Sequence, residues 1–225
     1  LGFFSQSEVD VRQGSTPNEV IVDVDVEEQP TGSFTLGGSY SVDDGIGVAI
    51  GISENNFLGR GQQLSFNIST AQDTEAYNMR FVEPKLLGRD LQFAIDLGLS
   101  ETESSFSEYD TKSVIFRPSI TFDASDTTSL QLRYGFEQNE MESRGPNSSG
   151  QPRVGPVLQR EIAAGKRTTS SIGATFTYDS RRTGLNPTAG FLIQSGVDYA
   201  GLGGDNEYIR ATSKIVAQKL VFNEE

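Results

Sequence analysis

Alternation of apolar and polar residues, renewed after each turn, most constrains what this chain can fold into. In residues 46–53 the apolar residues Ile46, Val48, Ile50 and Ile52 alternate with glycine, alanine and serine. The same period of two recurs in residues 64–69, 91–99 and 114–122. This period places apolar side chains on one face of a β-strand and polar side chains on the other. The sequence therefore predicts an all-β fold.

About ten strands are predicted after the first thirty residues. They are residues 33–41, 45–55, 62–72, 75–83, 91–103, 111–123, 128–140, 168–179, 189–200 and 206–221. Their polar face carries glycine, serine, asparagine, aspartate and arginine, and it is poor in lysine. A soluble sandwich or lipocalin-type barrel would instead turn its large apolar residues inward and its charges outward. We therefore predict an antiparallel transmembrane β-barrel meander, with its apolar face towards lipid.

Composition narrows the possible functions. The net charge is −13, which argues against nucleic acid as a partner because phosphate binding needs a basic surface. The chain has no cysteine and no histidine, so disulfides, thiol chemistry and histidine-based sites are excluded. The densest polar clusters are Glu27-Glu28, Asp43-Asp44 and Arg181-Arg182. They are interpreted as solvated strand ends and turns, so no enzyme activity, cofactor or metal site is predicted.

Residues 1–30 form a segment of different character. Valines at positions 9, 11, 20, 22, 24 and 26 predict two strands, joined by a turn at residues 14–18. Residues 29–32 then form a short linker. The chain opens in what looks like the middle of a domain, so two parts are predicted: residues 1–30 as the end of one domain, and residues 31–225 as the barrel portion.

The connections between predicted strands fall into two sets. Compact turns occur at residues 56–61, 85–90 and 123–127, whereas a long polar segment covers about 137–167. Short turns at one end and long loops at the other are typical of transmembrane barrels. The Phe57-Leu58-Gly59-Arg60 and Leu86-Leu87-Gly88-Arg89 turns also look like an internal repeat, one hairpin apart.

Several stretches resemble one family. Residues 1–9 and 22–34 are similar to the end of a POTRA domain passing into a first barrel strand, residues 52–62 and 81–89 to the first two periplasmic turns, and residues 178–190 to a mid-barrel turn. These stretches resemble the BamA family of outer-membrane barrel assembly factors, within a superfamily whose barrels follow POTRA domains. The resemblance implies a fragment: the end of the last POTRA domain and the first part of the barrel. The closing strands and the family's Arg-Gly-Phe loop motif do not occur in these residues.

The resemblance also implies a function and its site. Such proteins insert nascent outer-membrane proteins, with assembly lipoproteins at the periplasmic side, in the lipid of the outer membrane of Gram-negative cells, with the POTRA part in the periplasm. Substrate strands would be accepted at a lateral gate formed by the first barrel strand, whose residues are Ser33, Phe34, Thr35, Leu36, Gly37, Gly38, Ser39, Tyr40 and Ser41. An unpaired edge offers N–H and C=O groups to an incoming strand. Proline at alternate positions such as Ser33, Thr35 or Gly37 is expected to block it.

Alternatives remain open at this stage. A two-partner secretion pore uses the same superfamily barrel to export a polypeptide. A passive porin would show a lumen-lining charge ladder and no POTRA segment, and residues 1–30 argue against it. Gly37 and Gly38 weaken strand pairing, or they simply relieve crowding on the barrel wall.

Overall fold

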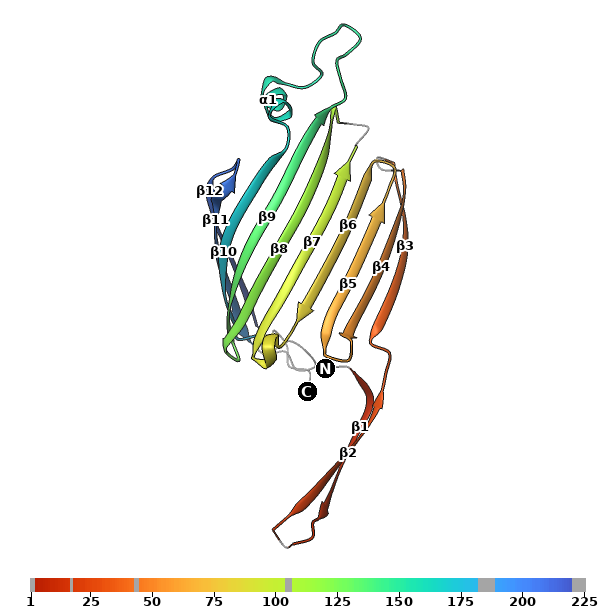
Figure 1. Ribbon diagram of the computed structural model, residues 1–225, viewed down its shortest axis with the longest axis vertical. Helices are drawn as coiled ribbons and strands as arrows, with labels where there is room; N and C mark the ends of the chain where they lie inside the picture. Colours follow the sequence, from red (N-terminus) through yellow and green to blue (C-terminus); the bar gives the residue numbers. More distant parts are fainter. Residues whose placement is uncertain (1–2, 17, 43–44, 104–106, 182–188, 220–225) are drawn as a thin grey trace.

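A curved antiparallel sheet with a separate hairpin at one end forms the molecule. The computed structural model describes residues 3–16, 18–42, 45–103, 107–181 and 189–219. The sheet comprises ten strands in strict sequential order. They are β3 (Gly32–Ser41), β4 (Gly45–Phe57), β5 (Gln62–Thr70), β6 (Thr74–Glu83), β7 (Leu91–Thr102), β8 (Tyr109–Ser125), β9 (Thr128–Ser143), β10 (Arg167–Asp179), β11 (Gly190–Gly204) and β12 (Tyr208–Gln218). The predicted all-β meander of about ten strands is confirmed (Figure 1).

The hairpin pairs β1 (Phe4–Gln13) with β2 (Val20–Glu28) and extends away from the sheet (Figure 1). Val9 lies opposite Val24, and Val11 lies opposite Val22, so the valines share one face. These four valines are all exposed in this chain. A two-stranded hairpin has too little apolar burial to be stable alone. Its valine face therefore needs a further layer to cover it.

The compact turns predicted after β4, β6 and β8 and the long connection after β9 lie at opposite ends of the sheet, but the connections after β5 and β11, at the long-connection end, are also short. The turns after β4, β6 and β8 lie at the same end as the hairpin, and the long connection after β9 lies at the other end (Figure 1). A sequential meander requires this, because each hairpin returns the chain to the end where it began. The predicted positions of Asp43, Asp44 and residues 182–188 lie outside the described residues.

The long connection corrects the sequence analysis in two ways. Strand β9 continues to Ser143, and a short helix α1 (Pro156–Ala164) follows, where a polar loop over 137–167 was predicted. Pro156 at the first helical turn has the φ that a helix needs and lacks only an N–H that would be unbonded there. Gly165 ends the helix with φ +68°. The remaining strand boundaries differ from prediction by a few residues, as expected of fraying ends.

Register assigns the two faces of the sheet. Fourteen large residues predicted to face lipid share one face: Phe34, Leu36, Val48, Ile50, Phe66, Phe81, Phe93, Ile95, Phe116, Ile120, Leu132, Tyr134, Phe176 and Val197. We call this the apolar face. The buried residues Val82, Ala94, Thr169, Asp198 and Ala200 belong to the opposite, polar face. Side chains converge and cover one another on the inside of a curved sheet, so the polar face is the inner face.

A charge network on the polar face extends from β9 to β12. The Nε of Arg133 on β9 donates to Oδ1 of Asp198 on β11 at 2.8 Å, although β10 lies between them. Gly173 on β10 is opposite both residues, and a Cβ there would lie 2.0 Å from Asp198 Oδ1. The second oxygen of Asp198 accepts from Arg210 on β12 at 3.1 Å. Because Gly173 has no side chain, Arg133 can reach across β10 to Asp198 on β11.

A polar contact at the long-loop end joins β10 to the turn after β11. Asp205 accepts a hydrogen bond from the backbone N–H of Thr168 at 2.7 Å and a second from its hydroxyl. These two bonds lower the pKa of the Asp205 carboxyl, because they favour the ionised form. A lowered pKa in the folded state contributes stability above the carboxyl's ordinary pKa, and that stability is lost as the pH falls.

Replacing Gly173 tests the network. Gly173→Ala is expected to separate Arg133 from Asp198, which leaves the nearly buried carboxylate poorly paired and lowers the free energy of unfolding by about 2 kcal/mol. The heat-modifiable gel mobility of the full-length protein, followed against urea, measures this. Gly38→Ala is the control, because a Cβ there meets nothing within 4 Å. Equal urea midpoints for the two variants would contradict the role of Gly173.

Candidate functional site

The predicted gate strand forms one edge of the sheet. The sheet order ends at β3, which pairs with β4 over its full length, from Gly32 opposite Glu54 to Ser41 opposite Gly45. Ser33 and Ser53, which are opposite each other, join their hydroxyls at 2.7 Å. The structure therefore brings residues 33–41 together as one continuous edge strand, as the sequence predicted.

Hydrogen-bond parity identifies which N–H groups of β3 point away from β4. In an antiparallel pair, residues alternate between positions that exchange both backbone hydrogen bonds and positions that exchange none. The N–H of Asn55 donates to the oxygen of Thr31 at 3.2 Å, which marks residues 31 and 55 as a bonded pair. In β3 the odd-numbered residues therefore bond to β4. The N–H groups of Phe34, Leu36, Gly38 and Tyr40 point to the outer edge.

This parity corrects the positions at which proline should block the edge. Ser33, Thr35 and Gly37 direct their N–H groups towards β4, so proline at these positions would break the pairing with β4 instead. An independent hydrogen bond agrees, since the N–H of Ala71 donates to the oxygen of Thr74 at 2.7 Å. When the alternation is followed from this pair through β5 and β4, it again directs the odd-numbered N–H groups of β3 towards β4. Sequence alternation alone cannot make this distinction, because it reports side chains and not the direction of the N–H groups.

The paired glycines of β3 are not explained by crowding. A Cβ at Gly37 would come no closer than 3.9 Å to Ala49, and a Cβ at Gly38 would meet nothing within 4 Å. In the neighbouring strand, by contrast, a Cβ at Gly47 would lie 2.6 Å from the Ser39 hydroxyl. Crowding among the described residues therefore does not account for Gly37 and Gly38. What remains is their effect on the strand itself, since glycine weakens pairing and packing.

The base of β3 is held by a polar cluster. The Thr31 hydroxyl donates to Oε1 of Glu54, which also accepts from the N–H of Asn56 at 2.7 Å. The Asn56 side chain in turn accepts from the N–H of Gly61 at 2.8 Å. These bonds join the linker before β3 to the β4–β5 turn. The sequence analysis missed this clamp, although Glu54, Asn55 and Asn56 stand together just before a glycine-rich turn.

A cleft lies where the hairpin meets the barrel turns. It has a volume of about 890 Å³, and both the hairpin linker and the turns after β4 and β6 line it. Phe3, Pro30 and Pro84 contribute apolar surface, whereas Arg60 and Lys85 contribute positive charge. A Cβ at Gly61 would lie 3.8 Å from the Phe3 ring, so the hairpin and the first turn approach closely here.

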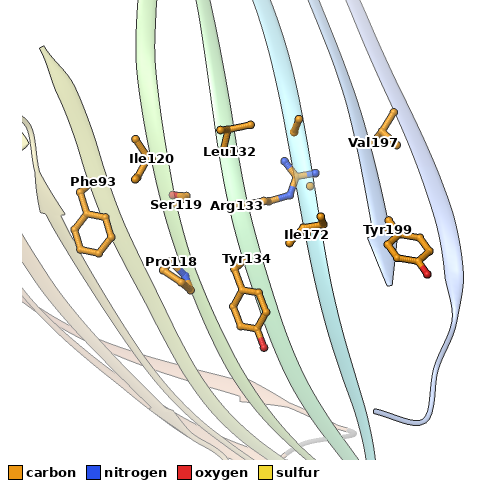
Figure 2. A pocket seen from close by; sticks show the side chains of 12 residues that line it. Phe93, Pro118, Ser119, Ile120, Leu132, Arg133, Tyr134, Ile172, Val197 and Tyr199 are labelled. Atoms are coloured by element: carbon orange, nitrogen blue, oxygen red, sulfur yellow. The ribbon is translucent and has the colours of Figure 1, made fainter. Parts of the chain in front are cut away.

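A second concavity lies on the apolar face (Figure 2). Phe93, Ile120, Leu132 and Val197 line one side of this hollow of about 630 Å³, and Tyr134 and Tyr199 line the other. The Tyr134 hydroxyl is hydrogen-bonded to Ser170 at 2.9 Å, so its polar end is satisfied. The hollow has almost no polar lining, which suits contact with hydrocarbon and not a reaction.

The described residues offer neither a metal-ligating cluster nor a long apolar helix. They contain no cluster of three or more acidic residues placed to hold a metal ion. None of the helices in the described ranges has the length and hydropathy needed to span a membrane.

Tilted antiparallel strands, one apolar face and a polar inner face define part of a membrane-spanning β-barrel. The Omp85 superfamily domain matches residues 56–224, which is most of the sheet. The chain therefore belongs to the Omp85 superfamily.

Individual relatives agree with this assignment. The outer membrane protein assembly factor BamA of Neorickettsia risticii is 23% identical over 228 residues, covering 100% of this chain and 29% of the relative. BamA of Nitratidesulfovibrio vulgaris is 22% identical over 210 residues, with 92% and 25% covered. A putative outer membrane protein assembly factor of Treponema pallidum is 32% identical over 108 residues, with 44% and 12% covered. The chain thus spans about a quarter to a third of the BamA relatives it matches.

Solved structures share the fold. BamA from Haemophilus ducreyi lacking POTRA domains 1–3 superposes with a TM-score of 0.68 at 18% identity, covering 95% of this chain and 42% of that chain. CdiB from Acinetobacter baumannii gives a TM-score of 0.58 at 15% identity, with 94% and 40% covered. The resemblance to a BamA-like fragment predicted from sequence is confirmed. The gate role of residues 33–41 stays a prediction.

The two kinds of glycine give a matched test. Gly47→Ala is expected to reduce barrel stability by roughly 1–2 kcal/mol, because its Cβ must displace the Ser39 hydroxyl. Gly38→Ala is expected to leave stability unchanged or slightly raised. Urea midpoints of the full-length variants in the same detergent measure both effects. Equal losses would show that the glycines of β3 and β4 are constrained alike.

Proposed function

We propose that this chain is part of an outer-membrane protein assembly factor whose first barrel strand, β3, accepts strands of nascent barrels. The observation that carries the proposal is the direction of the even-numbered N–H groups of β3, which point away from β4 to the side where a further strand would pair. An incoming strand would add to that edge by β-augmentation. The names of the BamA relatives support the assembly role.

The remaining assignments follow from the same proposal. Residues 1–30 form the end of the last POTRA domain, whose missing layer would cover the exposed valines of the hairpin. This part lies in the periplasm and offers a surface to assembly lipoproteins. The barrel lies in the outer membrane with its apolar face in lipid, and it carries out no chemical reaction.

A polypeptide-secreting pore of the two-partner type is the second candidate. The fold likeness to CdiB is compatible with it, but that likeness is weaker than the likeness to BamA. The two candidates differ in what the edge of β3 does. A secretion pore passes its polypeptide through the lumen, so blocking the outer edge of β3 would leave export intact.

Proline substitution tests the edge directly. Leu36→Pro and Gly38→Pro remove outward-pointing N–H groups, so they are expected to reduce outer-membrane porin assembly by at least about tenfold while the barrel stays folded. Thr35→Pro is the matched control on the same strand, because its N–H bonds to β4 and its loss should weaken barrel stability. Porin levels and heat-modifiable mobility of the full-length protein are measured together. Normal porin assembly in a folded Leu36→Pro protein would refute strand addition at this edge.

Surface labelling tests the orientation. Single cysteines at Ser149, in the long connection, and at Asp90, in the turn after β6, lie at opposite ends of the sheet. Because the hairpin end is proposed to be periplasmic, a membrane-impermeant maleimide should label Ser149→Cys on intact cells and Asp90→Cys only after lysis. The opposite pattern would reverse the proposed topology.

A further inference from the structure

Two turns at the hairpin end of the barrel share an unusual backbone. Leu58 has φ +56° and Leu87 has φ +54°, and each is followed by a glycine with φ of +68° or +72°. The N–H of Gly59 donates to Asn56 O, and that of Gly88 to Lys85 O, both at 2.9 Å. The internal repeat seen in the sequence is therefore a repeat in three dimensions. We call residues 57–60 and 86–89 the Leu-Gly-Arg turns.

Leucine is a poor choice for this conformation. Positive φ brings Cβ against the backbone, so glycine and asparagine normally occupy such positions. Both leucines are also exposed, Leu58 by 74% and Leu87 by 90%. Neither backbone geometry nor burial within the chain accounts for a large apolar side chain at the same place in two turns. A contact outside the chain would account for it.

The position of the two leucines indicates which kind of partner, protein or lipid, makes that contact. The cleft between hairpin and barrel is lined by Gly59, Arg60 and Lys85, but neither Leu58 nor Leu87 contributes to it. The two leucines therefore lie outside the cleft beside the hairpin. They lie in the turns that follow the membrane-spanning strands β4 and β6, at the end of the strands where the hydrocarbon region of a membrane ends.

We propose that Leu58 and Leu87 insert into the phospholipid leaflet at this end of the barrel and hold the rim at a fixed depth. A leucine at the end of lipid-facing strands extends their apolar surface, and Arg89, the last residue of the second turn, supplies a cation for lipid phosphate. This surface is independent of the edge of β3, so it stands or falls separately from the proposed function.

The turn after β8 offers a built-in comparison. Asp126 and Thr127 form this turn at the same end of the sheet, and they carry no large apolar side chain. The structure therefore assigns interfacial insertion to two of the described turns at this end and not to the third.

Nitroxide accessibility measures the insertion. The full-length protein is reconstituted in vesicles of phosphatidylethanolamine and phosphatidylglycerol, with a single nitroxide at Leu58→Cys, Leu87→Cys or Asp126→Cys. Oxygen concentrates in the bilayer, whereas a nickel chelate stays in water. Collision with oxygen is expected to dominate at positions 58 and 87, and collision with nickel at 126. Nickel-dominated collision at all three positions would overturn the proposal, and so would shielding of 58 and 87 from both reagents, because protein would then cover them.

A second variant separates anchoring from turn geometry. Leu87→Asn keeps a residue that tolerates positive φ but removes the apolar side chain. A nitroxide at the exposed neighbour Asp90→Cys should shift towards nickel-dominated collision when Leu87→Asn is added. Val157→Asn, on the exposed face of α1 at the other end, is the control and should produce no shift. An unchanged collision ratio at position 90 in a correctly folded Leu87→Asn protein would overturn the proposal.

Discussion

The rest of this structure depends on the need of every strand for hydrogen-bonded neighbours. Hydrocarbon offers no partners for backbone N–H and C=O groups, so a sheet can cross a membrane only where each edge is matched. In β4 to β11, both sides of each strand meet this condition through the sequential ladder. β12 and β3 each have an outer edge at which the condition has to be met by something else, and the edge of β3 is the proposed gate. Its residues combine glycine, which weakens pairing, with a base that the linker holds in place.

Much of the fold could be predicted from the alternation of apolar and polar residues along the sequence. Strand identity and the lipid-facing set followed from period two, because a one-residue error would reverse the face of every side chain in a strand. The helix α1 was missed because its nine residues are too few for a helical period to be recognised within a connection predicted as a polar loop. Its only signal was Pro156 at the start and Gly165 at the end, which also fits a loop.

The candidate site was predictable in position but not in detail. The family resemblance marked residues 33–41, and the structure assembled them as one edge strand. The direction of each N–H group depends on register, which turn geometry and long-range pairing set. The same limit applied to Gly37 and Gly38, because the sequence could not distinguish relief of crowding from weaker strand pairing. The structure shows that a Cβ at either position would have no close neighbour among the described residues. The left-handed backbone conformation of Leu58 and Leu87 likewise could not be predicted from the sequence, because leucine rarely adopts it.

The bond from Arg133 to Asp198 affects how the wall can bend. Backbone ladders join nearest neighbours and leave the angle between successive strands soft. A side-chain bond that skips a strand fixes the distance across two gaps, so flattening the sheet between β9 and β11 would stretch it. The side-chain bonds described for β3 to β6 join adjacent strands, such as Ser33 to Ser53 and Gln62 to Glu83. The curvature of the sheet is thus fixed between β9 and β11 and less constrained between β3 and β6. Slow changes in the curvature of the barrel wall should therefore be largest beside β3.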